Sequence, residues 1–510
     1  MNCAIVRSLI TVAALSLAGP ALAQTTAPAP AERRAEMSGS ITVGGKPLDY
    51  TTRAGTLIVN DSSGEPTAEL FYVAYELKGA KPETRPLTFI WDGGPGGSTM
   101  IMDVLGYGPM RYSPTANPSA RAPFQARPNP DTLLQHSDLV FIDLIGTGYS
   151  RAIGKAQDKD FWGVDADANV ATAAIERYLK LNERWQSPKF LLGNSYGTTR
   201  ASVVAHRLQG RGIALNGVVL VASIFTYGVF SNGIDHQFVV NLPTLAAVAW
   251  YHGKTAHQAV PLAKFIDDVQ RFARSDYAEA LFLGNTLSPE RRAAIAQRLA
   301  GYIGLDAGYI ERAQLRVSMI RFRKELLRSQ GKVLGRLDGR EVSTDFDHAG
   351  EEPETDHTVI SRLYIPAATL LQEMLGKMGY REDAPYVLLN EQAIKVWNWD
   401  HPVPITAGIS ERETADRNVL PQNTWVTADL GAAMRANRQL KVFQIHGYYD
   451  LATPFAMGDY DLARMTFDEA LRNNIRVAYY ESGHMPFVDD AHIAQMNRDI
   501  AEFYKSAMAK

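Results

Sequence analysis

The feature that most constrains the fold is the segment GNSYG at residues 193–197, which stands directly between an apolar run and a helical stretch. The run Phe190–Leu192 is typical of a short buried strand, and helical spacing follows as far as about Gln209. In this context the pattern G-x-S-x-G predicts a sharp strand-to-helix turn that projects a serine hydroxyl at the carboxyl edge of a sheet. We therefore expect Ser195 to be a nucleophile; the alternative is an ordinary glycine-rich turn.

Apolar and helical segments alternate in two parts of the chain. Strands are predicted at Thr56–Asn60, Glu69–Leu77, Leu87–Asp92, Asp138–Leu144, Phe190–Leu192, Gly217–Ala222, Leu440–Ile445 and Ile475–Tyr480. The first two are expected to form a hairpin. Helices are predicted at Asp165–Glu183, from the GNSYG turn to Gln209, at Met457–Arg472 and at Asp490–Lys505. Strands that alternate with helices predict an α/β fold with a mostly parallel sheet.

The alternation stops between about Phe225 and Asp429, where amphipathic helical segments such as Pro289–Ala300 and Ile310–Arg328 prevail. The chain is therefore predicted to be one α/β core interrupted by a large helical insertion. We place the core at residues 37–226 and 431–510 and the insertion at 227–430.

The first 23 residues have the organisation of a signal peptide. A basic Arg7 precedes the apolar run Leu9–Ala18, and the sequence Ala-Leu-Ala ends at Ala23. The run is shorter than the ~20 apolar residues that cross a membrane, so we expect cleavage after Ala23 rather than an anchor. Residues 24–36 are predicted to be a linker. We expect an exported, bacterial protein that is periplasmic or secreted, with no membrane span in the mature chain.

Composition excludes several classes of protein. With 46% hydrophobic residues the chain can build a core, so it is not a disordered protein. Lys and Arg total 52 and Asp and Glu total 55, a near-balance that argues against nucleic acid as the main partner. The only cysteine, Cys3, leaves with the signal peptide, so no disulfide is expected. His252 and His257 do not share a helix face, so they are not expected to bind a metal together. The acidic loop at 351–357 is expected to be solvated. No metal or cofactor is therefore predicted.

A nucleophilic serine needs a base and an acid that orients the base. His484 follows the last predicted strand, and Asp450 follows the strand before it. Both therefore lie at carboxyl ends of strands, where α/β sheets place their ligands. Asp459 and Asp489 are rival acids on or near predicted helices. His446 is a rival base, but it lies inside a strand end and is expected to be a hydrogen-bonded core residue.

Acyl transfer also needs hydrogen-bond donors for the oxyanion that develops on the substrate. One donor is expected to be the backbone N–H of Tyr196, which follows the nucleophile. The other is expected from the loop WDGGPGGS at 91–98, because its glycines allow backbone N–H groups to approach a substrate closely. The alternative is a plain glycine-rich loop.

Five blocks of the sequence, in this order, resemble the serine carboxypeptidases. They are GGPGGS at 93–98, DLIGTGYS at 143–150, GNSYG at 193–197, GYYD at 447–450 and GHM at 483–485. The resemblance implies an α/β-hydrolase fold, a helical cap in place of the insertion, and release of C-terminal residues from peptides through an acyl-enzyme. It also implies a catalytic triad of Ser195, Asp450 and His484, with an oxyanion hole formed by Gly94 and Tyr196.

Four positions depart from the family pattern: Gly97 replaces a cysteine, and the other three concern substrate binding. Asp92 replaces an Asn, Asn194 replaces a Glu, and Gly106 aligns with a further Glu. In the family, the side chains at positions 92 and 194 help hold the C-terminal carboxylate of the substrate, so the resemblance implies substrate binding by Asp92, Gly93 and Asn194. Because an acid and an amide remain in exchanged places, a carboxylate can still be held if Asp92 is protonated.

The function expected from the sequence is that of an exported serine-type carboxypeptidase with peptide substrates. The alternative is a prolyl or tripeptidyl aminopeptidase, or an esterase of the same fold; the GTGYS block at 146–150 and the position of the cap favour the carboxypeptidase. An intact serine, acid and histidine disfavours a non-catalytic scaffold. Four aromatic residues are candidates for either the substrate site or the core: Trp397, Trp399, Tyr448 and Tyr449.

Overall fold

The computed structural model describes residues 30–114, 121–231, 233–353, 356, 359–402, 404, 424–465 and 469–509. Glu32–Lys510 forms one compact unit, to which everything below refers. The predicted signal peptide (1–23) and the first part of the predicted linker lie outside the described residues. The linker prediction is wrong at its end, because strand β1 already begins at Arg34 and pairs with the following strand.

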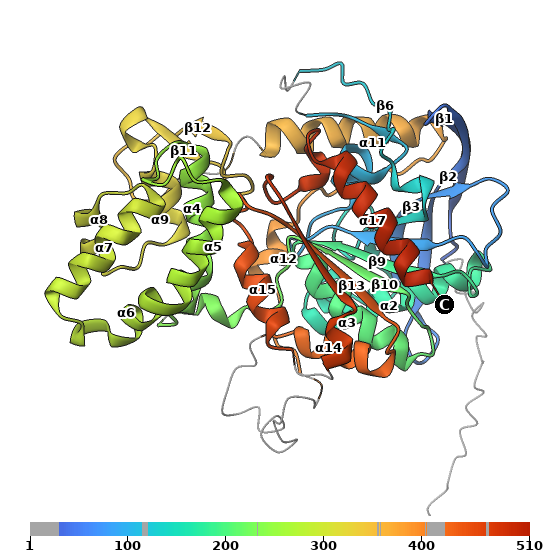
Figure 1. Cartoon of the computed structure of the whole chain (residues 1–510). Helices are drawn as coiled ribbons and strands as arrows, with labels where there is room; N and C mark the ends of the chain where they lie inside the picture. Colours follow the sequence, from blue (N-terminus) through green and yellow to red (C-terminus); the bar gives the residue numbers. More distant parts are fainter. Residues whose placement is uncertain are drawn as a thin grey trace, which may run out of the picture. The chain divides into compact units, whose positions relative to one another are not determined.

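A ten-stranded sheet runs through this unit (Figure 1). Its order is β1 (Arg34–Val43), β2 (Lys46–Asn60), β3 (Pro66–Leu77), β7 (Asp138–Ile142), β4 (Leu87–Trp91), β9 (Lys189–Asn194), β10 (Gly217–Val221), β13 (Lys441–Gly447) and β14 (Ile475–Tyr480), with β8 (Arg151–Ala152) paired to β3. From β7 to β14 every neighbouring pair is parallel, whereas β1, β2 and β3 are antiparallel. The predicted α/β-hydrolase fold with a mostly parallel sheet is confirmed.

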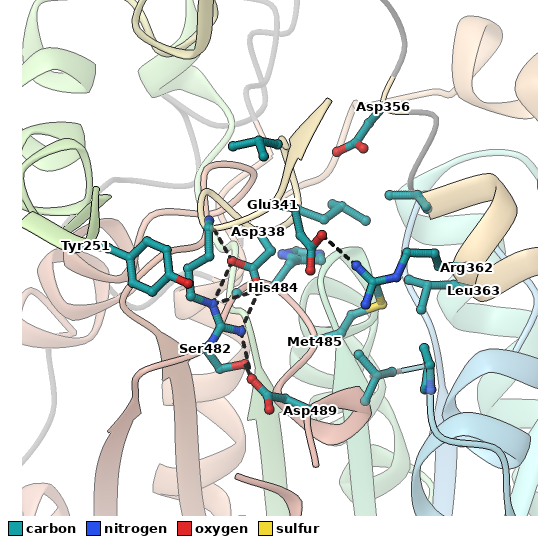
Figure 2. A pocket seen from close by; sticks show the side chains of 17 residues that line it. Tyr251, Asp338, Glu341, Asp356, Arg362, Leu363, Ser482, His484, Met485 and Asp489 are labelled. Atoms are coloured by element: carbon teal, nitrogen blue, oxygen red, sulfur yellow. Dashed lines mark hydrogen bonds and ion pairs between the residues drawn. The ribbon is translucent and has the colours of Figure 1, made fainter. Parts of the chain in front are cut away.

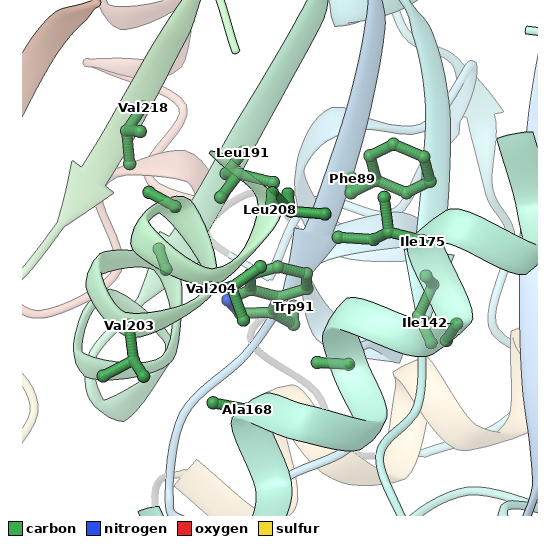
Figure 3. Close-up of a cluster of buried hydrophobic side chains, with 14 of the residues drawn as sticks. Phe89, Trp91, Ile142, Ala168, Ile175, Leu191, Val203, Val204, Leu208 and Val218 are labelled. Atoms are coloured by element: carbon green, nitrogen blue, oxygen red, sulfur yellow. The ribbon is translucent and has the colours of Figure 1, made fainter. Parts of the chain in front are cut away.

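Both faces of the sheet are covered, because alternate side chains of its central strands enter different apolar clusters. Phe89 and Trp91 of β4 point to one cluster, and Ile90 between them points to the other. Figure 3 shows the first cluster, where the strands pack against α2 (Val164–Leu181) and α3 (Tyr196–Gly210). The second cluster contains residues of α1 (Met100–Met102), π-helical turn η1 (Asp103–Tyr107) and α17 (Ile493–Met508).

The insertion divides into regions that pack differently. The first part of the insertion forms an apolar cluster of its own, which also includes Tyr449, Leu451 and Phe455 of the core. This first part consists of α4 (His236–Tyr251), α5 (Leu262–Phe272), η5 (Ala273–Tyr277), α6 (Ala278–Leu283), α7 (Pro289–Ile303), α8 (Ala307–Arg312), α9 (Met319–Glu325) and the hairpin of β11 (Lys332–Leu334) and β12 (Val342–Thr344). Its second part joins the clusters of the sheet and consists of η8 (Ile360–Tyr364), α11 (Ile365–Lys377), α12 (Glu391–Val396) and α14 (Thr427–Ala436). The boundary drawn at 430/431 therefore falls inside α14.

Short elements complete the described part of the chain. They are β5 (Met110–Arg111), β6 (Arg127–Pro128), α15 (Phe455–Ala463), α16 (Glu469–Arg472), and the turns η2 (Leu133–Gln135), η3 (Asp158–Phe161), η4 (Gly228–Phe230), η6 (Gly284–Thr286), η7 (Arg328–Gln330) and η9 (Pro486–Val488). The helix predicted over Ile310–Arg328 is wrong, because the backbone turns left-handed at Gln314 and Leu315. The helix predicted over Met457–Arg472 ends at Ala463, and α16 is separate.

Candidate active site

Ser195 lies at the turn between β9 and α3, as the GNSYG segment predicted. Its φ of 56° and ψ of −128° belong to a strained conformation that a non-glycine residue rarely adopts. The flanking glycines are required, since a Cβ on Gly193 would lie 2.1 Å from the carbonyl oxygen of Gly197. The Ser195 N–H is anchored to the carbonyl of Val221 on the neighbouring strand at 2.9 Å. The turn therefore holds a partly exposed serine at the carboxyl edge of the sheet.

His484 and Asp450 meet at the same edge, in the loops after β14 and β13. His484 Nδ1 lies 2.8 Å from Asp450 Oδ2, and both side chains are buried. Asp450 Oδ1 also accepts the N–H groups of Ala452 and Thr453, at 2.8 and 2.9 Å, and its Oδ2 accepts the Thr453 hydroxyl at 2.7 Å. Burial alone would raise the pKa of Asp450, but the charge and hydrogen bond of His484 lower it below its usual range. An ionised Asp450 can thus orient the imidazole.

The structure separates the rival acids from His484. Asp459 accepts hydrogen bonds from Tyr479 and Gln444. Asp489 is bound by Arg340 at 2.7 Å. Asp450 therefore stands alone among the three proposed acids in contacting the His484 ring.

His446, the rival base, is buried inside β13, and burial lowers its pKa to about 4. The expectation that it is hydrogen-bonded is wrong, because neither ring nitrogen has a hydrogen-bond partner among the described residues. The Nε2 atom lies 3.9 Å from Asp459 Oδ1, beyond hydrogen-bond distance.

No hydrogen bond joins the Ser195 hydroxyl to His484 among the described residues. Within the described residues the Ser195 hydroxyl makes no hydrogen bond. Catalytic hydrogen bonds are often long without substrate and tighten when it binds. The structure thus brings the acid and base into contact and places the serine at the same sheet edge.

The glycine-rich loop after β4 packs directly against the turn that carries Ser195. A Cβ on Gly93 would lie 2.5 Å from Ser195 Cβ and 2.7 Å from the Tyr196 nitrogen, so no other residue fits there. Among the described residues neither Gly94 nor Tyr196 donates its N–H to a protein acceptor. Two N–H groups beside the nucleophile are thus available to donate hydrogen bonds to an oxyanion.

A buried arginine beneath these groups was not predicted from the sequence. Arg200 of α3 donates to Asp167 of α2 at 2.6 and 3.1 Å and to the backbone carbonyl of Asp92 at 2.9 Å. Its guanidinium also lies over the ring of Tyr196, 5.2 Å from the centroid. Arg200 therefore joins α3, the helix that follows Ser195, to α2 and to the start of the glycine-rich loop.

Asp92 and Asn194, the predicted substrate-binding pair, contact each other. Asn194 Nδ2 donates to Asp92 Oδ1 at 2.8 Å, and the same oxygen accepts the N–H of Gly93 at 2.8 Å. Burial raises the pKa of Asp92 above its usual range, although the hydrogen bonds from Asn194 and Gly93 oppose the shift. The raised pKa favours the protonated form of Asp92 that binding of a carboxylate requires.

Gly106 lies in η1, where the family glutamate is absent. A Cβ on Gly106 would lie 2.8 Å from Phe487 Cδ2, so Phe487 occupies the space of a side chain at this position. The carbonyl of Gly106 accepts Asn129 Nδ2 at 2.9 Å. The structure therefore has no room for a glutamate side chain at position 106 without a shift of Phe487.

A cavity of about 330 Å³ opens beside His484. Figure 2 shows that Ser482, His484, Met485 and Asp489 of the core border it together with Asp338 and Glu341 of the insertion. None of the four aromatic candidates borders it. Trp397 packs on Tyr196, Trp399 on Tyr227 and Tyr448 on Tyr479, while Tyr449 is buried.

Two further kinds of feature are absent from the described part of the chain. In the described ranges, no three His, Cys, Asp or Glu side chains cluster in a way that would hold a metal ion. The helices described here include none with the length and apolar character needed to cross a membrane.

Comparisons with known proteins agree with this geometry. The family model described as serine carboxypeptidase matches residues 44–239. A prohormone-processing carboxypeptidase of Saccharomyces cerevisiae has a similar structure, with a TM-score of 0.51 and 12% identity over 89% of this chain and 91% of the yeast chain. Proline iminopeptidase of Mycobacterium smegmatis has a TM-score of 0.37 and 13% identity over 89% of this chain and 98% of its own. No curated protein sequence matches the chain.

The resemblance to the serine carboxypeptidases is therefore confirmed, with the family match confined to residues 44–239. Taken with the α/β-hydrolase fold, it supports a hydrolase.

Proposed function

We propose that this protein is a serine peptidase that removes C-terminal residues from peptides. The observation that carries the proposal is the 2.8 Å hydrogen bond between His484 and Asp450 at the sheet edge where the strained turn presents Ser195. This combination of nucleophile, base and orienting acid is the arrangement of serine hydrolases. The family match over residues 44–239 supports the peptidase class.

In the proposed reaction, Ser195 Oγ attacks the carbonyl carbon of the scissile peptide bond while His484 Nε2 takes the hydroxyl proton. Asp450 holds the ring by accepting from Nδ1. The negative charge that develops on the carbonyl oxygen is stabilised by the N–H groups of Gly94 and Tyr196, each contributing about 2.7–4 kcal/mol. His484 then gives its proton to the leaving amine, and an acyl-enzyme on Ser195 remains. Water, deprotonated by His484, releases the acyl group and restores the serine.

Asp92 and Asn194 are proposed to bind the C-terminal carboxylate of the substrate. Asp92 lies next to Gly93, which touches the Ser195 turn, so a carboxylate held there would be close to the nucleophile. Two carboxylates repel unless one is protonated, and the raised pKa of Asp92 provides the proton. Recognition of this carboxylate would distinguish the carboxypeptidase from an aminopeptidase or esterase of the same fold.

Mass spectrometry of a mixed peptide pool tests the proposal. After incubation with the protein we expect peptides shortened from the carboxyl end and intact amino ends. The Ser195→Ala variant, with an otherwise unchanged chain, should leave the pool untouched. Shortening from the amino end would identify the aminopeptidase alternative, and turnover by the Ser195→Ala variant would refute Ser195 as the nucleophile.

A further inference from the structure

The loop between β11 and β12 contacts both loops that carry the proposed acid and base. The His484 N–H donates to the carbonyl of Leu337 at 2.6 Å. The Gly339 N–H donates to the carbonyl of Tyr449, the residue before Asp450, at 2.8 Å. One short segment of the insertion, residues 335–341, therefore binds the backbone on both sides of the His484–Asp450 pair.

Close packing leaves this segment little freedom. A Cβ on Gly483 would lie 2.5 Å from the Leu337 carbonyl oxygen, and a Cβ on Gly339 would lie 2.5 Å from Val248 Cγ2 of α4. The His484 loop on one side and α4 on the other thus enclose the segment. Because Gly483 leaves no space between the two backbones, a displacement of the segment would move the His484 loop.

The side chain of Arg340 joins this segment to the core by hydrogen bonds. Nη1 donates to the carbonyl of Glu481 at 2.8 Å, and Nη2 donates to Asp489 Oδ2 at 2.7 Å. Nε and Nη2 also donate to Asp338, at 3.0 and 2.6 Å, which fixes the guanidinium plane. Glu481 and Asp489 stand on either side of His484 in the chain, so Arg340 bridges the two ends of the histidine loop.

The same guanidinium reaches the loop of the acid. It lies over the ring of Tyr449, with Cζ 5.4 Å from the centroid. Tyr449 in turn donates its N–H to the carbonyl of Ser482, at 3.0 Å, in the histidine loop. Arg340 thereby contacts both loops at the point where they are hydrogen-bonded to each other.

We propose that Arg340 is a positioning residue that holds the His484 loop in register with the Asp450 loop from within the insertion. The inference rests on the proposed function, since it assigns Arg340 a role in positioning the base and acid of the Ser195–His484–Asp450 machinery. The planar guanidinium is required because one group must donate in several directions at once, which the single ammonium of a lysine does with less fixed geometry. A misplacement of about 1 Å in a catalytic group can cost on the order of 100-fold in rate.

Steady-state hydrolysis of a peptide by Arg340→Met tests this role. We expect kcat to fall at least ~10-fold while KM changes less than ~3-fold, because Asp92 and Asn194, the proposed substrate-binding groups, are untouched and the base is displaced. Arg340→Lys should restore part of the lost kcat. The control is Arg316→Met, which breaks another two-pronged arginine–carboxylate pair of the insertion, with Asp235, away from the described site. It should retain the wild-type kcat.

Thermal unfolding of the three variants separates positioning from folding. We expect Arg340→Met and Arg316→Met to unfold at similar temperatures and yet differ in kcat. Equal kcat values in these two variants would overturn the inference. If Arg340→Met does not fold, Arg340→Lys decides: a reduced kcat supports the role and an unchanged kcat refutes it. Failure of the proposed function is recognised separately, as wild-type protein without Ser195-dependent turnover.

Discussion

At the scale of single residues, Asp92 is the group whose protonation bears most directly on the substrate. It faces Asn194 through one hydrogen bond, and its pKa is raised by burial. Below that pKa the carboxyl can donate a hydrogen bond to a substrate carboxylate, and above it the two negative charges repel. Peptide binding should therefore weaken as the pH rises through the pKa of Asp92.

Asp92→Asn tests this assignment. The amide keeps a donor at every pH, so we expect the rise of KM for peptides with pH to disappear in the variant. Small esters carry no terminal carboxylate, and their hydrolysis should change less than ~2-fold at any pH. The measurement is KM for both substrates between pH 4 and pH 8. Equal effects of the substitution on peptide and ester would contradict the proposed role of Asp92.

At the scale of elements, His401 joins helix α2 of the core to helix α14 at the end of the insertion. Its Nδ1 lies 3.1 Å from Asp165 of α2, and its Nε2 lies 2.8 Å from Asp429 of α14. Burial disfavours the charged ring, but the hydrogen bonds and charges of both carboxylates outweigh burial and raise the pKa to about 9. Arg207 and His206 bind the same two carboxylates from α3. A positively charged His401 thus holds the end of the insertion on the core.

This contact predicts a pH-dependent stability. The folded pKa of about 9 lies above the ordinary value of 6.5, so the stabilisation is complete below about pH 6.5 and is lost as the pH rises through about 9. We expect His401→Gln to lower the free energy of unfolding at pH 6 by about 2–3 kcal/mol more than at pH 9.5. Urea unfolding at both pH values measures the difference. The exposed His348→Gln is the matched control, and a His401→Gln effect that is the same at both pH values would rule out a charged His401.

Helix boundaries show what could not be predicted at this scale. The apolar spacing of Ile310–Arg328 continues through a break, because Leu315 is buried although its backbone is left-handed. Apolar periodicity reports which side chains are buried, not which φ angles bury them. By contrast, Pro289–Ala300 was predicted closely, since Ser288 caps α7 and Pro289 begins it.

At the scale of the whole molecule, the α/β core could be predicted because strands, helices and the GNSYG turn alternate locally in the sequence. The contacts of the insertion could not be predicted. Leu389 pairs with Gly97 and Val387 with Gly148, so the second part of the insertion lies along the glycine-rich loops of the core. Leu337 and Arg340 bind the histidine loop from another part of the chain, and no motif marks either residue. Such contacts depend on tertiary packing between segments far apart in sequence.

Identification of the residue modified by a fluorophosphonate tests the central claim most directly. The reagent forms a covalent bond with a serine only when that serine is activated by a neighbouring base. Peptide mapping of the wild-type protein should place the adduct on Ser195, and the His484→Ala variant should react at least ~100-fold more slowly, because the base is missing. An adduct on another residue, or labelling of Ser195 at the same rate without His484, would contradict the account.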